Sequence, residues 1–183
     1  MAESLQDNIQ NTATTIKLPP NSLEAEQSVL GGLMLNDQHW FDLVDILQPS
    51  DFYRNQHQLI YQAMIELANQ DESLDAVTVS EKLKSKAMLE KDGGIEYLGQ
   101  LAESSTGASN VLAYARIIRE RSVLRQLIGA ANQIADSAFS TEGKDSETLL
   151  EKAEQAIFSI SEREGSVDGP MGIDSLLTRA VER

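Results

Sequence analysis

The stretch that decides the fold runs from Asn110 to Arg163. Its first part, from Asn110 to Ser140, reads NVLAYARIIRERSVLRQLIGAANQIADSAFS. Its apolar residues recur with a spacing of three and four that repeats about every seven positions, which predicts a helix packed lengthwise on a partner. This stripe consists of Ile117, Leu124, Leu127, Ile128, Ala131, Ile134, Ala135 and Ala138. At 1.5 Å per residue the helix is roughly 45 Å long, which exceeds the diameter of a small domain. Part of it should therefore project from the domain.

The chain continues STEGKDSETLLEKAEQAIFSISER, up to Arg163, which predicts a second helix folded back on the first. A polar turn around Gly143 ends the first helix, and Asp145 or Ser146 can cap the second, which begins near Glu147. One face of the second helix is predicted to hold Leu150, Ala153, Ile157 and Ile160, with Leu149 and Ala156 beside it. Because the second helix is shorter, it cannot cover the whole first stripe, and an intermolecular contact is the natural partner for the remainder.

The composition favours an all-α protein, in which a small helical bundle precedes the hairpin. Of the 183 residues 41% are hydrophobic but only 5% aromatic, and runs of strand-forming residues are scarce. The absence of cysteine excludes disulfides and thiolate metal sites and fits a reducing cytoplasm. No apolar run approaches the roughly 20 residues of a membrane span, and the amino terminus lacks the pattern of a signal peptide. We therefore expect a cytoplasmic protein without a membrane partner.

The net charge of −14 comes from 29 acidic and 15 basic residues. DNA affinity normally arises from Lys and Arg that neutralise phosphates, so we expect no tight DNA binding by this segment. The acidic surface favours solubility, and the alternative is docking of a basic partner. The one basic cluster is formed by Arg116, Arg119, Arg121 and Arg125. Arg116 and Arg119 are expected to pair with acids such as Glu120 or Glu103 rather than with phosphate.

Changes in composition divide the chain into five parts. Residues 1–18 are polar without a usable period and predict a disordered arm. Residues 19–109 predict a globular bundle of short helices, and residues 110–164 form the hairpin. Residues 165–172 contain three glycines and predict a flexible linker. Residues 173–183 resume helical spacing, which predicts the start of a linker helix.

The first predicted helix of the bundle contains the pair Gly31-Gly32 after a capping box formed by Asn21 and Glu24. Each glycine costs about 1 kcal/mol relative to alanine inside a helix. The pair therefore indicates either that another helix crosses very closely or that this helix ends early. A second capping box, TVSE at residues 78–81, predicts the start of a later helix.

Motifs for catalysis are absent, and no catalytic, cofactor-binding or metal-binding residue is predicted. Gly143-Lys144 lacks the earlier glycine of a phosphate-binding loop and is followed by an aspartate. The only histidines, His39 and His57, are more typical of packed or surface positions than of ligands. Paired acids on the helices fit solvated faces better than a general acid–base pair.

Residues 19–163 nevertheless resemble the amino-terminal domain of the DnaB family of bacterial replicative DNA helicases. The stretches that carry the resemblance are PPNSLEAEQSVLG (19–31), DFY (51–53) followed by His57 and Ile60-Tyr61, LDAVTV (74–79), GGIEYL (93–98), and YARI (114–117) through LRQLI (124–128). Their order and spacing make the match specific. Residues 171–183 resemble the start of the family's linker helix.

The resemblance implies a collar domain made of a helical bundle and a long hairpin. In such helicases the hairpins pair two subunits, and three pairs form a collar on a hexameric ring. The ring's other tier is a RecA-like ATPase that uses ATP and Mg²⁺ to unwind duplex DNA. This chain ends before that tier, so we expect the segment itself to be no enzyme and to hold no cofactor.

The partners implied by the resemblance are a second copy of the chain, primase and the helicase loader, at the replication fork. The family's linker helix packs on the ATPase domain of the adjacent subunit, which implies this docking for Ile173, Leu176 and Leu177. The alternative is a stand-alone helical adaptor or loader-like module that binds proteins.

Five residues are candidates for the subunit or primase interface: Tyr97, Leu127, Ile128, Ile134 and Ile157. The hairpin residues lie where a partner hairpin could reach, and Tyr97 precedes the hairpin base. Ordinary core packing is the alternative for each, with equal weight for Ile128 and Ile134, and it is favoured for Tyr97. On this interpretation Ile134→Glu should disrupt assembly and leave helicity intact.

Overall fold

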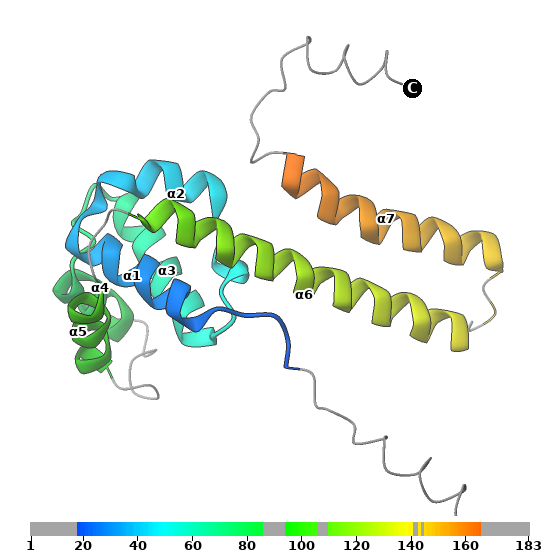
Figure 1. Cartoon of the computed structure of the whole chain (residues 1–183), viewed down its shortest axis with the longest axis horizontal. Coiled ribbons are helices and arrows are strands. Elements are labelled where there is room, and N and C mark those ends of the chain that lie inside the picture. The colour runs from blue at the N-terminus through cyan, green and yellow to red at the C-terminus, as the bar shows by residue number, and fades with distance from the viewer. Residues whose placement is uncertain (1–17, 86–93, 106–109, 141–142, 144, 166–183) are drawn as a thin grey trace, which may run out of the picture.

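The computed structural model describes residues 18–85, 94–105, 110–140, 143 and 145–165. These residues form helices and turns without a strand, which confirms the predicted all-α fold. Figure 1 shows short helices gathered at one end of the molecule and two long helices that run side by side away from them. The predicted disordered arm and the linker helix fall almost wholly outside the described residues.

The described elements follow one another as bundle and then hairpin. In chain order they are α1 (Leu23–Leu35), η1 (Asp37–His39), α2 (Trp40–Ile46), η2 (Pro49–Asp51), α3 (Asn55–Ala68), α4 (Ala76–Ser85), α5 (Gly94–Ser104), α6 (Val111–Phe139) and α7 (Ser146–Gly165), where η marks a 3-10 turn.

The pair Gly31-Gly32 lies inside α1, where α5 and α6 cross it closely. A Cβ on Gly31 would lie 2.0 Å from the carbonyl oxygen of Leu101 in α5, and a Cβ on Gly32 would lie 2.8 Å from the Cγ2 of Val111 in α6. Since α1 continues to Leu35, the close-crossing interpretation is confirmed and the early helix end is wrong. Gly31 therefore lets α1 pack directly on the backbone of α5, and Gly32 makes room for the Val111 side chain of α6.

The start of α1 differs from the prediction. The helix begins after Ser22, and the Asn21 side chain donates a hydrogen bond to the carbonyl of Pro19 at 2.9 Å instead of capping the helix. Ser22 therefore occupies the N-cap position of α1, and the Asn21 amide bonds within the segment before the helix.

The centre of the bundle is Tyr61 of α3, whose side chain is fully buried. Its ring centroid lies 4.9 Å from that of Phe52 and 5.7 Å from that of Trp40. Its hydroxyl donates to the carbonyls that end α2, at 3.4 Å from Leu43 and 3.5 Å from Leu47. Burial first, and the nearby carboxylate of Asp51 second, raise the pKa of the Tyr61 phenol well above its ordinary range, so it remains a donor.

Helix α4 begins two residues before the predicted capping box because Asp75 caps it. One carboxylate oxygen of Asp75 accepts from the backbone N–H of Val77 at 2.8 Å and of Thr78 at 3.1 Å, and the other accepts from the Ser73 hydroxyl at 2.8 Å. These hydrogen bonds, the one from Thr78 foremost, lower the pKa of the Asp75 carboxyl.

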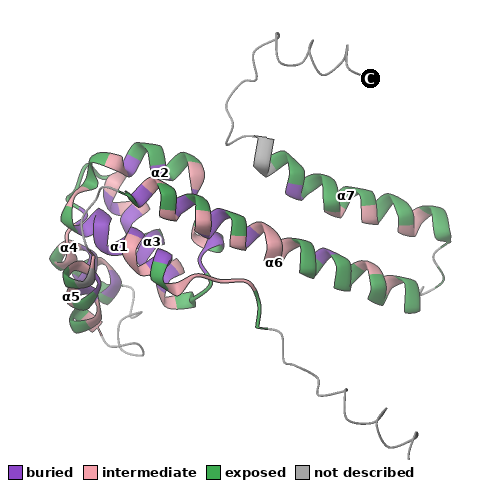
Figure 2. Ribbon diagram, viewed as in Figure 1, coloured by how far each residue is buried: buried purple, intermediate pink, exposed green. Residues whose placement is uncertain are grey.

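Helix α6 belongs to both halves of the molecule. Its 29 residues span roughly 43 Å. Val111, Ala115 and Ile118 of its first part are buried in the bundle core, whereas Ala130 is the one buried residue after Ser122. Figure 2 shows this change along α6, from purple beside the bundle to green toward the far end. The second half of α6 therefore projects, with α7 packed beside it.

We predict that Gly31→Ala destabilises the protein by at least about 2 kcal/mol, because the added methyl would clash with the backbone of α5 and separate the helices. Gly99→Ala in α5 is the matched control, since nothing lies within 4 Å of the Cβ it adds. The control should be neutral or stabilise by up to about 1 kcal/mol. Urea unfolding followed by circular dichroism measures both, and equal stabilities would contradict the close crossing.

We predict that Asp75→Ala costs about 1 kcal/mol at pH 7 through loss of the cap. Because folding lowers the pKa of this carboxyl, its contribution is present above the unfolded pKa and is lost as pH falls through the folded pKa. The difference between the two proteins should therefore begin to shrink as pH falls below the ordinary aspartate pKa of about 4. Asp75→Asn, which keeps an acceptor without a titrating group, is the control. A penalty that stayed constant with pH would rule out the carboxylate cap.

Candidate protein-binding face of the helical hairpin

Helix α7 packs along α6 through one narrow row of side chains. The row consists of Leu149, Ala153, Ala156 and Ile160, which are buried or half-buried. Opposite them on α6 lie Ala130, Ile134 and Ser137, and a groove between the two helices is lined from both sides. The side chain of Asp145 accepts from the backbone N–H of Thr148 at 2.9 Å, which confirms a predicted cap of α7. The small residues in this row let the two helices approach closely.

This contact corrects the predicted face of α7. Leu150 and Ile157 were expected on one face with Ala153 and Ile160, but they are 64% and 43% exposed. Leu149 and Ala156 take their places against α6. Neighbouring apolar positions on a helix differ by about 100°, so the stripe alone does not distinguish between two overlapping faces.

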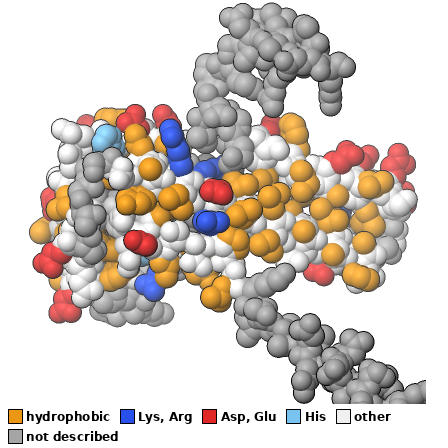
Figure 3. All heavy atoms as spheres, viewed as in Figure 1, with side chains coloured by type: hydrophobic (Ala, Val, Ile, Leu, Met, Phe, Trp, Pro, Cys, Tyr) orange, Lys and Arg blue, Asp and Glu red, His pale blue; other side chains and the backbone are white. Residues whose placement is uncertain are grey.

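A continuous apolar face results on one side of the hairpin. In α6 the exposed residues Leu127 and Ile128 are followed at helical spacing by exposed alanines, Ala131, Ala135 and Ala138. Because α7 runs antiparallel to α6, Leu150 and Ile157 fall on the same side of the pair. Figure 3 shows hydrophobic side chains gathered over both helices on the face turned to the viewer.

The opposite side of the hairpin is polar. It carries Gln133 and Asp136 of α6 and Lys152, Gln155 and Ser159 of α7 at the corresponding helical positions. A monomer normally exposes single apolar residues rather than a contiguous patch across two helices. The one-sided distribution is therefore typical of a surface that binds a protein.

The predicted interface residues separate into three groups. Leu127, Ile128 and Ile157 lie on the exposed apolar face, at 38%, 49% and 43% exposure. Ile134 is half-buried and lines the groove between α6 and α7. Tyr97 belongs to α5 in the bundle. Ile173, Leu176 and Leu177 lie outside the described residues.

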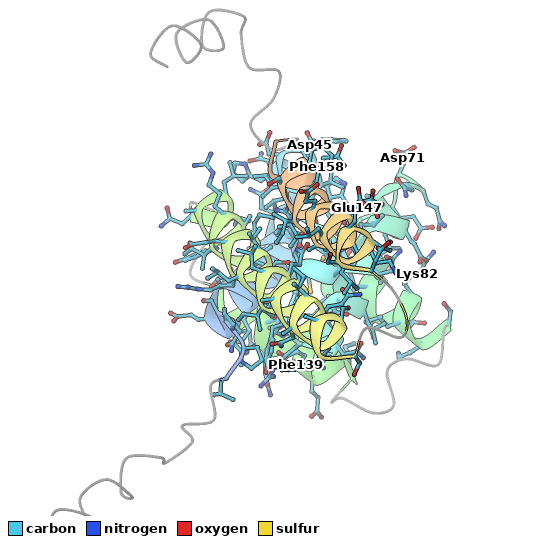
Figure 4. All side chains as sticks on the ribbon, turned by 90° about the vertical axis from the view of Figure 1, so that its right-hand side faces the viewer. Asp45, Asp71, Lys82, Phe139, Glu147 and Phe158 are labelled. Atoms are coloured by element: carbon cyan, nitrogen blue, oxygen red, sulfur yellow. The ribbon has the colours of Figure 1, made fainter. Side chains whose placement is uncertain are left out.

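Sequence reasoning missed two exposed aromatic side chains, Phe139 and Phe158, which are 91% and 62% exposed. Figure 4 shows Phe139 at the end of α6 and Phe158 on α7, well apart from each other. Neither residue fits the seven-residue repeat that defined the stripe. The available signal in the sequence was the presence of a large aromatic residue in each helix of a hairpin that is predicted to project.

A buried ion pair holds the base of the hairpin in the bundle. The carboxylate of Asp51, which is fully buried, accepts from the Arg119 guanidinium at 3.1 Å and from the Ser122 hydroxyl at 2.7 Å. Its second oxygen accepts from the backbone N–H of Gln48 at 2.8 Å. Arg119 thus pairs with an acid as expected, but the expected partners Glu120 and Glu103 were wrong.

About one turn beyond Ser122 on α6, Arg125 binds backbone carbonyls of the bundle. Its guanidinium donates to the carbonyls of Pro20 at 2.7 Å and Asp51 at 2.5 Å, and it lies 5.7 Å from the ring centroid of Tyr53. These contacts place two more charge-assisted bonds at the point where α6 leaves the bundle.

Tyr97 reaches a buried chain of hydrogen bonds through His57. The His57 Nδ1 lies 2.5 Å from a carboxylate oxygen of Glu26, and its Nε2 lies 2.7 Å from the Tyr97 hydroxyl. Glu26 also accepts from the backbone N–H of Tyr53 at 2.6 Å. His57 is therefore a packed histidine that joins α1, α3 and α5, as favoured over a ligand role. Within the part of the chain that the structure describes, no group of acids and histidines could hold a metal ion, and no helix is long and apolar enough to cross a membrane.

Residues 18–120 match the model of a family described as the DnaB-like helicase N terminal domain. Among curated proteins, the replicative DNA helicase DnaB of Haemophilus influenzae is 38% identical over 169 residues, which are 92% of this chain and 36% of the relative. That of Geobacillus stearothermophilus is 42% identical over 150 residues, 82% of this chain and 33% of the relative. The chain thus spans about a third of the length of these relatives.

Two solved structures are also similar to this chain. The N-terminal domain of DnaB helicase from Mycobacterium tuberculosis superimposes with a TM-score of 0.75 at 36% identity, covering 78% of this chain and 99% of that one. The corresponding domain from Helicobacter pylori, described with its interactions with primase, has a TM-score of 0.53 at 29% identity, covering 63% of this chain and 89% of that one.

We predict that Asp51→Ala destabilises the protein by about 3–5 kcal/mol, because the Arg119 guanidinium remains buried without this carboxylate. Glu81→Ala is the control, since it removes an ion pair with Lys84 whose side chains are 67% and 53% exposed. That change should stay below about 0.5 kcal/mol. Chemical denaturation measures both, and similar small effects would show that the buried pair does not hold the hairpin base.

Proposed function

This chain belongs to the DnaB-like replicative helicases and carries their N-terminal domain, and from this membership we propose that its hairpin pairs with the hairpin of a second copy in the helicase collar. The observation that carries the proposal is the apolar face across α6 and α7. Four large aliphatic side chains are exposed on this face, two from each helix: Leu127, Ile128, Leu150 and Ile157. The contact between α6 and α7 does not cover them.

The chemistry of the face favours a second copy as its occupant. The face is made of aliphatic residues and alanines, so the same surface can meet itself without bringing like charges together. Two hairpins stacked on these faces form a four-helix arrangement with a shared apolar core, which is a stable way to bury helical stripes. The alanines at positions 131, 135 and 138 permit close approach of the two copies.

The wider role follows from the family. We propose that the longer protein is an ATP-dependent helicase of the cytoplasm that unwinds duplex DNA with ATP and Mg²⁺, and that this domain contributes assembly and recruitment rather than chemistry. Primase is the proposed partner because the Helicobacter pylori domain is described with primase interactions. Docking of the helicase loader is proposed on the family resemblance alone. The net charge of −14 supports weak or no DNA binding by the domain itself.

We predict that Ile128→Glu weakens self-association at least tenfold, because the pairing would bury a carboxylate without a partner. Ile128 is half exposed in the single chain, so the helices should remain folded. Sedimentation velocity across micromolar concentrations measures the association, and circular dichroism measures helicity.

Val77→Glu provides the matched control, because Val77 is 62% exposed on α4 of the bundle. Ile134→Glu is a poorer test than first expected, since Ile134 packs between α6 and α7 and its change should also loosen the hairpin. If wild type were a strict monomer, or if Ile128→Glu associated like wild type, hairpin pairing through this face would be refuted.

A further inference from the structure

A second apolar surface lies on the bundle, on the outer side of α2. Phe41 is 79% exposed, which makes it the most exposed large apolar side chain in the described part of the bundle, and Val44 is 38% exposed. The two are three residues apart and so are neighbours on the helix surface. The inward side of the same helix carries Trp40 and Leu43, which are buried. Helix α2 therefore packs on the core through Trp40 and Leu43, and Phe41 lies on its solvent side.

The surroundings of this surface are acidic. No Lys or Arg occurs from Leu18 to Tyr53. Of the six acids in that span, Glu26 and Asp51 are buried and hydrogen-bonded, and Glu24 is exposed on α1. The other three, Asp37, Asp42 and Asp45, are exposed on η1 and α2. These three carboxylates flank Phe41 and Val44 along the chain. Figure 4 labels Asp45 and shows it at the outer edge of the molecule.

The elements beside this surface also carry basic groups. On the same segment, His39 lies 3.6 Å from a carboxylate oxygen of Asp42, and it carries a positive charge only when protonated. Helix α6 packs on α2 and bears four arginines. Arg119 and Arg125 bind Asp51 and backbone carbonyls of the bundle, whereas Arg121 is half-buried and Arg116 is exposed. An occupant of the α2 surface thus meets an aromatic side chain bordered by carboxylates.

We propose that the α2 surface, defined as Phe41, Val44 and the carboxylates of Asp37, Asp42 and Asp45, docks an amphipathic helix of another protein that bears Lys or Arg beside an apolar ridge. The apolar ridge covers Phe41 and Val44, and the basic residues neutralise the carboxylates. A second copy presenting the same surface would set carboxylates against carboxylates, which disfavours symmetric self-pairing here. The α2 surface therefore differs from the hairpin face in both location and chemistry, and its role does not depend on hairpin pairing.

The test uses the isotope-labelled chain and a synthetic helical peptide that repeats Leu and Lys in an amphipathic pattern. The control peptide has the same pattern with Glu in place of Lys. We expect the Lys peptide to shift the backbone amide signals of Asp37–Ile46 and the Glu peptide to leave them unchanged. Binding should weaken as salt is added, because the charges involved are exposed. Amide signals of α6 and α7 are followed separately, so that any binding to the hairpin face is recognised.

Two variants assign the binding to the α2 surface. Phe41→Ser should lower the affinity for the Lys peptide at least fivefold, and Val77→Ser, which removes an apolar side chain of α4 that is 62% exposed, should leave it unchanged. The pair Asp42→Lys and Asp45→Lys should exchange the preference, so that the Glu peptide binds instead. The proposal is overturned if the shifts are confined to the hairpin, if Phe41→Ser binds like wild type, or if the α2 variants change the self-association of the chain.

Discussion

The position of the hairpin relative to the bundle depends on the buried contact between the Asp51 carboxylate and α6. It joins a turn of the bundle to Arg119 and Ser122 of α6, and each partner is almost wholly shielded from water. Removing these charges from water is costly, and the cost is offset only while every hydrogen bond is kept. The arrangement therefore tolerates little sliding or rotation of α6. A long helix anchored at one end in this way keeps a defined direction where it leaves the domain.

The same anchoring creates the unpaired surface at the other end. The bundle buries α6 on the side of Val111, Ala115 and Ile118, and this sets which side of the helix is left for α7 beyond Ser122. Since α7 contacts α6 through one narrow row of side chains, it covers a narrow strip and leaves Leu127 and Ile128 in solvent. The exposed apolar face thus follows from which side of α6 packs on the bundle and which side packs on α7.

Local sequence patterns predicted the helices of this protein better than they predicted the tertiary contacts between them. The hairpin followed from the spacing of apolar residues, and the close helix crossing followed from two glycines inside a helix, because both signals are contained in a short stretch. The pairing of Arg119 with Asp51 joins residues 68 positions apart, and no local pattern distinguishes Asp51 from the nearer acids Glu103 and Glu120. The orientation of α7 was missed for a related reason. Two adjacent faces of that helix are both apolar, and the choice between them is made by packing on α6.

The two exposed apolar surfaces differ in what they can bind. The hairpin face combines aliphatic residues from two helices and carries little charge of its own, so it suits a partner with the same character, including itself. The α2 surface is smaller, is centred on one aromatic side chain and is bordered by carboxylates, so a copy of itself would meet electrostatic repulsion. In a chain with a net charge of −14, the proposed pairing of two copies places an uncharged apolar surface where they meet, and the proposed docking on α2 uses acids to select a basic partner.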